Sequence, residues 1–203
     1  MMARVEWITV GGAPEPWERL GLVVVDGLVP LFGTGVRIDP VASPGIAGWS
    51  ISGIGADVVE IDGVLTAPVA PAPPILVEHP IGAIGLDHIV VATDSLERTS
   101  AAVEAVTGAP LRRVREVGPI RQGFHRVGGG GLIVEVVERT GLAEGPASLW
   151  GFVINVEDLE AAVERIGPAT IGDITPAVQP GRSIATVRET AGLGVPLALM
   201  SPG

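Results

Sequence analysis

The chain has 203 residues, of which 47% are hydrophobic and 18% charged, and its formal net charge at pH 7 is −10. This length corresponds to one large domain or to two or three small modules. The acidic balance argues against a nucleic-acid partner, and the absence of cysteine excludes disulfides and thiolate metal sites. Every apolar run is interrupted well before the ~20 residues of a membrane-spanning helix, and the first residues do not resemble a signal peptide. We therefore expect a cytoplasmic protein without a membrane partner.

The N-terminal third is rich in predicted strands. A short helix over 14–22 begins with prolines, which are tolerated in a first turn. The strand predictions cover 5–10, 23–39 with internal turn residues, 48–54 and 56–62. The segment "APVAPAPP" at 67–74 predicts an extended, semi-rigid linker, so we divide the chain into residues 1–66, a proline-rich linker over 67–83, and a C-terminal part that begins at residue 84.

Residues 84–140 predict a βαβββ module. A strand over 86–93 leads to Asp94 or Ser95 as N-cap, a helix over 95–107 and Gly108 as its stop. The following strands are predicted at 111–117, 123–128 and 131–138. The glycines at 128–131 predict a hairpin turn and not a phosphate loop, because a strand follows them.

The module then repeats. The segment "SLWGFVINVEDLEAAVERIG" at 148–167 has the same strand, capped turn, helix and glycine, at a constant offset of 63, which predicts a second module over 147–203. Two such modules side by side predict an α+β fold with a curved, mostly antiparallel sheet around a cleft. "VEWITV" at 5–10 aligns Trp7 with His88, so residues 1–66 are predicted as a third, degenerate copy.

Paired βαβββ modules with a histidine in strand one and a glutamate in strand four resemble the vicinal oxygen chelate superfamily. This superfamily includes glyoxalase I, extradiol dioxygenases and methylmalonyl-CoA epimerase. The segments "RQGFHRVG", "LIVEVVE" and "LWGFVINVEDLEAAV" further resemble a glyoxalase-like group common in actinobacteria. The resemblance implies a divalent ion that is held by ligands from the paired modules and chelates two neighbouring substrate oxygens.

Transferred to this sequence, the resemblance supplies half of a metal site. His88 and Glu135 take the two ligand positions of the middle module, and Glu135 is also the candidate catalytic base. The last module has Gly151 and Ala198 at these positions. The N-terminal copy has Trp7 and, only loosely, Glu60. A zinc, nickel, manganese or iron ion is thus a candidate cofactor, for which His125 or His79 could add a third ligand.

The residues leave alternatives open. His88 and Glu135 are either metal ligands or a buried, hydrogen-bonded pair. Glu135 lies among the valines of 134–137, in a strand predicted to be buried on both faces, so we do not expect its carboxylate to be solvated. The further candidates for ligand binding are Gln122, His125, Trp150 and Arg182. Trp150 can equally be core packing, and Gln122 and Arg182 can be ordinary turn or edge residues. All thirteen basic residues are arginines, and seven lie within 98–139, either as a solvated face or as a patch for an anion.

Two functions are compatible with these residues. The first is a glyoxalase-like protein that binds a small, anionic or aromatic molecule in the cleft without a complete metal site. The second is a metal-dependent lyase, isomerase or dioxygenase that uses His88 and Glu135 as ligands. The loss of both ligands from the last module favours the first. A homodimer is a further expectation, because an odd number of modules leaves a sheet edge to cover.

Overall fold

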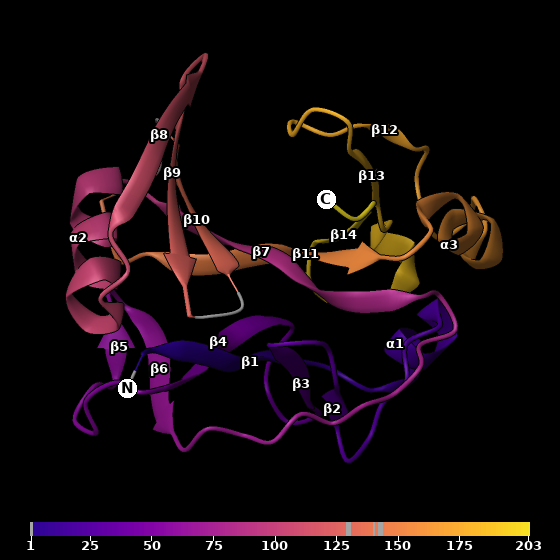
Figure 1. Ribbon diagram of the computed structural model, residues 1–203, viewed down its shortest axis with the longest axis horizontal. Coiled ribbons are helices and arrows are strands. Elements are labelled where there is room, and N and C mark those ends of the chain that lie inside the picture. The colour runs from indigo at the N-terminus through magenta and orange to yellow at the C-terminus, as the bar shows by residue number, and fades with distance from the viewer. Residues whose placement is uncertain (1, 129–130, 140, 142–143) are drawn as a thin grey trace.

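The computed structural model describes residues 2–128, 131–139, 141 and 144–203. The chain forms a six-stranded and an eight-stranded sheet, which lie one above the other and share one hydrophobic core (Figure 1). The α+β class and the curved, mostly antiparallel sheet predicted from the sequence are confirmed. Within these described ranges, no helix is long and apolar enough to cross a membrane.

The smaller sheet contains the N-terminal strands, in the order β2-β3-β1-β4-β6-β5. Its elements are β1 (Arg4–Gly11), α1 (Glu15–Leu20), β2 (Leu28–Val29), β3 (Gly35–Asp39), β4 (Gly45–Ser52), β5 (Glu60–Ile61) and β6 (Val64–Val69). The strand predicted over 23–39 is thus two strands separated by a loop. The predicted linker begins inside β6, and residues 70–82 connect the two sheets.

The larger sheet has the order β12-β13-β14-β11-β7-β10-β9-β8. Its first half consists of β7 (Ala83–Thr93), α2 (Leu96–Thr107), β8 (Leu111–Val117), β9 (Ile120–Val127) and β10 (Leu132–Arg139). Its second half consists of β11 (Ser148–Val156), α3 (Leu159–Ile166), β12 (Thr175–Pro176), β13 (Ser183–Thr186), a 3-10 turn (Glu189–Ala191) and β14 (Leu197–Met200). The glycine turn predicted at 128–131 lies partly outside the described residues.

Capping side chains explain where the helices α2 and α3 begin. The side chain of Ser95 accepts a hydrogen bond from the backbone of Arg98, and the side chain of Asp158 does the same for Ala161. Gly108 ends α2 in the left-handed conformation, at a φ of 70°. The helices α2 and α3 lie outside the two ends of the curved sheet, which leaves its concave face open (Figure 1).

The sequence repeat reappears in the strand pairing. In the first module, Val90 of β7 pairs in parallel with Glu135 of β10. In the second module, Val153 of β11 pairs in parallel with Ala198 of β14. The second pair follows the first at the interval of 63 that the sequence predicts, so Ala198 occupies the place of Glu135.

Both first strands of the larger sheet contain a β-bulge at the same place in their modules. In β7 the extra residue is Asp87, because Leu86 and His88 pair with consecutive residues of β11. In β11 the extra residue is Trp150, again 63 positions later. Such a bulge turns two adjacent side chains toward the same side of the sheet.

The smaller sheet repeats the centre of the larger one. Its central strands β1 and β4 are antiparallel, each is flanked by a parallel strand, and they contain bulges at Glu6 and Ala47. Glu6 precedes Trp7 just as Asp87 precedes His88. The pairing therefore favours two shortened modules, over 4–39 and 45–69, in place of the one degenerate copy predicted from the sequence.

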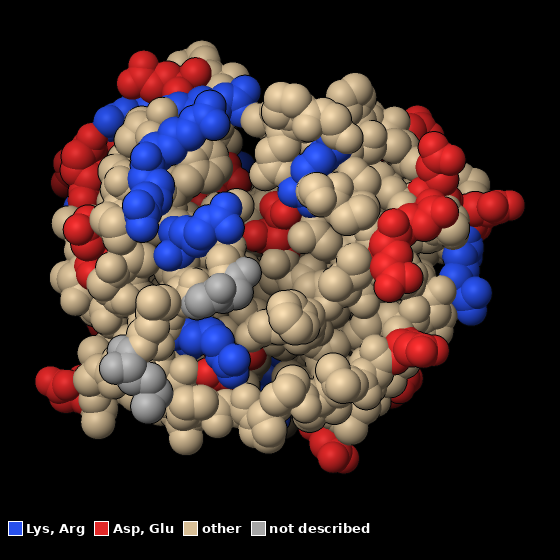
Figure 2. Space-filling model, viewed as in Figure 1, with Lys and Arg blue, Asp and Glu red and all other residues tan. Residues whose placement is uncertain are grey.

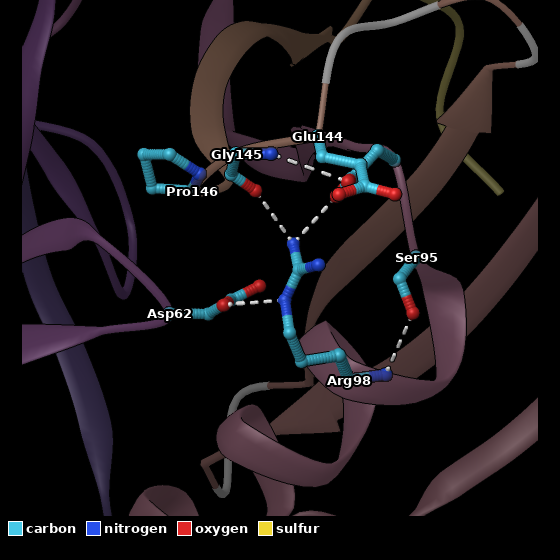
Figure 3. Close-up of a pocket in the computed structure, with 7 residues that line it drawn as sticks. Asp62, Ser95, Arg98, Glu144, Gly145 and Pro146 are labelled. Atoms are coloured by element: carbon cyan, nitrogen blue, oxygen red, sulfur yellow. Dashed lines mark hydrogen bonds and ion pairs between the residues drawn. The ribbon is translucent and has the colours of Figure 1, made fainter.

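The two sheets are joined by packing and by hydrogen bonds. Trp17 of α1 stacks on Phe152 of β11, with ring centroids 6.2 Å apart. Arg98 of α2 reaches across to the smaller sheet, where its Nε donates to Asp62 at 2.8 Å (Figure 3). Its guanidinium also donates to Asp94 at 2.6 Å and to the carbonyl oxygen of Gly145 at 2.8 Å. We call Asp62, Asp94, Arg98 and Gly145 the Arg98 clasp.

Candidate functional site

The open face of the larger sheet carries a cleft of about 740 Å3. Side chains of β7, β9 and β10 line its floor, the hairpin β8–β9 forms one wall, and the segment 176–180 with β13 and β14 forms the other. Figure 2 shows the hollow between these two lobes, with basic residues along one rim. The smaller sheet packs on the opposite side, so the cleft opens away from it (Figure 1).

The bulge in β7 places Asp87 beside His88, and His88 lines the cleft. Asp87 and His88 are adjacent in sequence, and Oδ2 of Asp87 lies 2.8 Å from Nδ1 of His88. Because an ionised carboxylate only accepts, Nδ1 of His88 carries the hydrogen of this bond and Nε2 points away from Asp87. The sequence reasoning missed Asp87, although two consecutive polar residues in an apolar strand are a visible departure from strand alternation.

His88 faces Glu135 from the neighbouring strand. Nε2 of His88 lies 3.5 Å from Oε2 of Glu135, and Gln122 of β9 donates to the other carboxylate oxygen at 2.6 Å. Burial raises the pKa of Glu135 above its ordinary value, an effect that His88 and Gln122 oppose only in part. The structure thus brings together three residues predicted for the site, His88, Gln122 and Glu135.

Arg182 lies at the other end of this polar chain. Its Nη1 donates to Oδ1 of Asp87 at 2.7 Å, and its Nε donates to the carbonyl oxygen of Ser201 at 2.9 Å. It also bonds the side chains of Gln179 and Asn155. Burial alone would raise the pKa of Asp87, but the hydrogen bonds from His88 and Arg182 lower it well below its usual range. Arg182 therefore positions Asp87, and its guanidinium is already occupied by protein groups.

Arginines form one wall of the cleft. Four of them line it: Arg112, Arg113, Arg115 and Arg126. Arg113 and Arg115 lie opposite Phe124 and Gln122 in the β8–β9 pairing, and they therefore share the cleft face of the hairpin. None of the four has a carboxylate within 4.0 Å among the described residues. We call these four residues the arginine wall.

The opposite wall is mainly apolar, although Gln179 also lines it and is hydrogen-bonded to Arg182. It is lined by Pro176, Ala177, Val178, Pro180, Ile184 and Met200. Behind it Val153, Ala198 and Met200 form a small hydrophobic cluster separate from the main core. Ala198 stands where the first module has Glu135, so the loss of the carboxylate helps to make this half of the cleft apolar. We call the six apolar lining residues the apolar wall.

Three residues proposed from the sequence do not join the polar group of His88, Gln122 and Glu135. His125 is among the residues that line the cleft, but its ring is buried and its Nδ1 bonds the carbonyl oxygen of Ala109 at 3.0 Å. Trp150 is 45% exposed at its bulge and stacks under Arg139, outside the cleft. Both ring nitrogens of His79 are occupied by backbone groups of Val23 and Pro30. The face of His125 and the position of Trp150 depend on strand register, which the sequence does not display.

The smaller sheet has no comparable pair of residues at its centre. Trp7 takes the place of His88, and Arg37 of β3 takes the place of Glu135 in the parallel pairing with β1. The guanidinium of Arg37 lies over the Trp7 ring, 4.9 Å from its centroid. Glu60, loosely aligned with Glu135 from the sequence, lies instead on the short strand β5 and is exposed.

Comparison with solved structures gives the fold a name. The structure is similar over 98% of its length to a variant of 4-hydroxymandelate synthase from Streptomyces coelicolor, covering 92% of that chain, with a TM-score of 0.71 and 13% identity. It is also similar to methylmalonyl-CoA epimerase from Mycobacterium tuberculosis, over 60% of this chain and 90% of that one, with a TM-score of 0.51 and 16% identity. The chain has the vicinal oxygen chelate fold. No protein-family model and no curated protein sequence matches it.

The vicinal oxygen chelate fold implies a divalent metal, and the residues of this chain do not fit one. His88 and Glu135 are the two donors that face each other, whereas the second module offers Gly151 and Ala198. A Cβ added at Gly151 would lie 2.7 Å from the carbonyl oxygen of Pro196, so this position has no room for a ligand side chain. The described part of the chain contains no group of three or more acidic, histidine or cysteine residues arranged to hold a metal ion. Resident ions in proteins usually have three or four protein ligands.

Proposed function

We propose that this protein binds a small, oxygen-bearing anion in the cleft of its larger sheet and does so without a complete metal site. The observation that supports this proposal is the arginine wall. Four arginines face the cleft without a carboxylate partner among the described residues, in a chain whose formal net charge is −10. Guanidinium groups match carboxylates and phosphates in geometry and charge.

The polar floor complements this wall. Glu135 is a buried carboxyl whose pKa is raised by burial, and Gln122 donates a hydrogen bond to one of its oxygens. His88 is held in one orientation by Asp87, so its Nε2 is a fixed acceptor that can face a hydroxyl group of the ligand. We propose these three residues as hydrogen-bond acceptors for hydroxyl groups that accompany the anionic group of the ligand.

Calorimetric titration with acetate, pyruvate, malonate and inorganic phosphate tests the proposal. We expect saturable binding that weakens about tenfold or more in Arg113→Gln and Arg115→Gln, because a hydrogen bond to a charged group contributes about 1.5–3 kcal/mol. Arg165→Gln, an exposed arginine of α3 outside the cleft, is the matched control. Absence of saturable binding by every anion, or equal binding by all three variants and the unsubstituted protein, would contradict it.

A second candidate is a metal-dependent lyase, isomerase or dioxygenase with His88 and Glu135 as the protein ligands and Glu135 as base. One observation favours it: the bond between Asp87 and Nδ1 of His88 resembles the carboxylate contact that orients metal-binding histidines. The donor set argues against it. Thermal unfolding with zinc, nickel, manganese and ferrous ions separates the two candidates, since a bound ion would raise the Tm and His88→Ala would abolish the rise.

Three finer expectations stay predictions. Membership of the glyoxalase-like group common in actinobacteria rests on short segments of sequence, and the cytoplasmic location rests on composition. A homodimer is supported by the edge strand β8, where Val114 and Val117 are 43% and 44% exposed. Size-exclusion chromatography with light scattering tests the last of these.

A further inference from the structure

We propose that the ligand of the cleft is an amphiphilic anion, in which an apolar body of several carbons carries a carboxylate or phosphate at one end. This inference rests on the anion-binding function proposed above and adds the chemistry of the rest of the molecule. It comes from the difference between the two walls of the cleft, which the arginine wall alone does not explain.

The two walls come from different modules and have opposite chemistry. The arginine wall belongs to the first module, which retains the charged residues of the floor. The apolar wall belongs to the second module, in which Gly151 and Ala198 replace the polar positions of the first. One molecule in contact with both walls therefore meets cations at one end and aliphatic side chains at the other.

Part of the apolar wall is exposed to solvent, and a bound ligand would cover it. Val178 is 70% exposed, between two prolines that also line the cleft. Ile184 and Met200 complete the wall and rest on the small hydrophobic cluster formed with Val153 and Ala198. Burial of such aliphatic surface stabilises a complex by about 25 cal/mol per Å2 of apolar area.

The size of the cleft agrees with a ligand longer than a bare anion. A volume of about 740 Å3 lies within the range of pockets that hold cofactor-sized or drug-sized molecules. An acetate or phosphate ion seated on the arginine wall would leave most of this space open beside the apolar wall. A chain of several methylenes, or an aromatic ring, would fill it.

Calorimetric titration with straight-chain carboxylates tests the inference. Acetate, butanoate, hexanoate, octanoate and decanoate, each below its micelle concentration, should bind with affinity that rises up to about fourfold per methylene, the equivalent of about 0.8 kcal/mol per buried CH2. The rise should level off when the chain outgrows the wall. Octanol and octylammonium should bind at least tenfold more weakly than octanoate, because they lack the anion that the arginines recognise.

Two substitutions test the apolar end and the anionic end of the ligand separately. Val178→Ser should weaken decanoate about threefold to fivefold and leave acetate unchanged, because it removes aliphatic surface from an exposed loop position where folding is not at stake. Arg113→Gln should weaken all the carboxylates by the same factor. Val41→Ser, an exposed valine between β3 and β4 and outside the cleft, is the control for the first variant, and Arg165→Gln is the control for the second.

The outcomes distinguish this inference from the function on which it rests. Arginine-dependent binding of acetate with no gain in affinity along the series overturns the amphiphilic ligand and leaves anion binding in place. Equal binding of octanoate, octanol and octylammonium overturns the anionic end. Failure of every carboxylate and of phosphate to bind overturns both proposals, whereas a rising series that Val178→Ser flattens supports both.

Discussion

Arg182 and Asp87 form an ion pair with 2.7 Å between Nη1 and Oδ1, and their side chains are only 11% and 8% exposed. The pair joins two modules, because Arg182 precedes β13 and Asp87 lies in the bulge of β7. Through Asp87 it also reaches His88 and the floor of the cleft. The second module has Gly151 and Ala198 at the positions that match His88 and Glu135. Through Arg182 and Asp87 it nevertheless orients His88 of the first module.

The first prediction concerns this ion pair. Asp87→Asn should lower the free energy of unfolding at neutral pH by about 3 kcal/mol, because it leaves the buried charge of Arg182 without its partner. Asp173→Asn, at an exposed position, is the control. Denaturant unfolding of Asp87→Asn, Arg182→Gln and the double variant measures the coupling, and the double variant should lose less than the sum of the two single losses.

The direction in which this loss of unfolding free energy changes with pH can also be predicted. Because the pKa of Asp87 is lowered by folding, its stabilising contribution is present above the ordinary value of 3.8 and is lost as the pH falls below it. The difference in unfolding free energy between the unsubstituted protein and Asp87→Asn should therefore shrink below about pH 4. A difference that is constant from pH 7 to pH 3 would contradict the assigned cause.

The second prediction concerns Glu135. Folding raises the pKa of this carboxyl through burial, so its ionised form opposes folding at neutral pH. Glu135→Gln should raise the Tm at pH 7–8 by roughly 2–4 °C, the equivalent of about 1 kcal/mol for a chain of this size. The gain should shrink as the pH falls through the raised pKa of folded Glu135 and should vanish below the ordinary value of 4.5, where the carboxyl is protonated in the folded and unfolded chain alike.

The control for Glu135→Gln is an exposed glutamate. Glu164→Gln on α3 should leave the Tm unchanged within about 1 °C at both ends of this pH range. A Tm that falls in Glu135→Gln at pH 8 would show instead that the ionised carboxylate stabilises the cleft, and would make an ionised pair with His88 the better description of the floor.

Local signals in the sequence predicted much of this fold. Helix α2 begins at its serine cap and ends at Gly108, as predicted, because caps act within a few residues of the chain. The repeat at an interval of 63 predicted the pairing of the modules, since two copies of one sequence pattern make one kind of strand pairing. The placement of His88 and Glu135 on neighbouring strands of one module followed from the resemblance to the vicinal oxygen chelate superfamily, and β7 and β10 do pair.

The rest of the site depends on register, which no local pattern shows. The bulges at Asp87 and Trp150 exist only in relation to the partner strand, and each changes which side its neighbours face. They explain why Asp87 lies beside His88 and why Trp150 lies outside the cleft. Arg182 finds its partners across the sheet, at Asp87 and Ser201, and a sequence does not reveal such distant contacts.

The third prediction concerns the Arg98 clasp. Arg98→Ala removes the hydrogen bonds to Asp62 and Gly145 that join α2 to the smaller sheet and to the start of the second module (Figure 3). Because the Arg98 side chain is 42% exposed, we expect only a small fall in Tm, which diminishes at high salt. Thermal unfolding at 0.05 M and 1 M sodium chloride measures it, with Arg165→Ala as control. A loss that is equal at both salt concentrations would assign the effect to packing.

The last prediction concerns Gly151, the position at which the resemblance places a histidine in the second module. A Cβ at this position would lie 2.7 Å from the carbonyl oxygen and 3.0 Å from the Cβ of Pro196, and a backbone atom cannot move aside as a flexible side chain can. Gly151→Ala should therefore cost about 1–3 kcal/mol of unfolding free energy.

The matched control is Gly172→Ala, whose new Cβ would meet its nearest atom, the carbonyl oxygen of Thr186, at 3.4 Å. It should lose less than 1 kcal/mol in the same denaturant titration. Gly151→His combined with Ala198→Glu should unfold still more readily than Gly151→Ala and should gain no stability from zinc or nickel ions. A double variant as stable as the unsubstituted protein and stabilised by either ion would show that the second half of the cleft can still accept a metal.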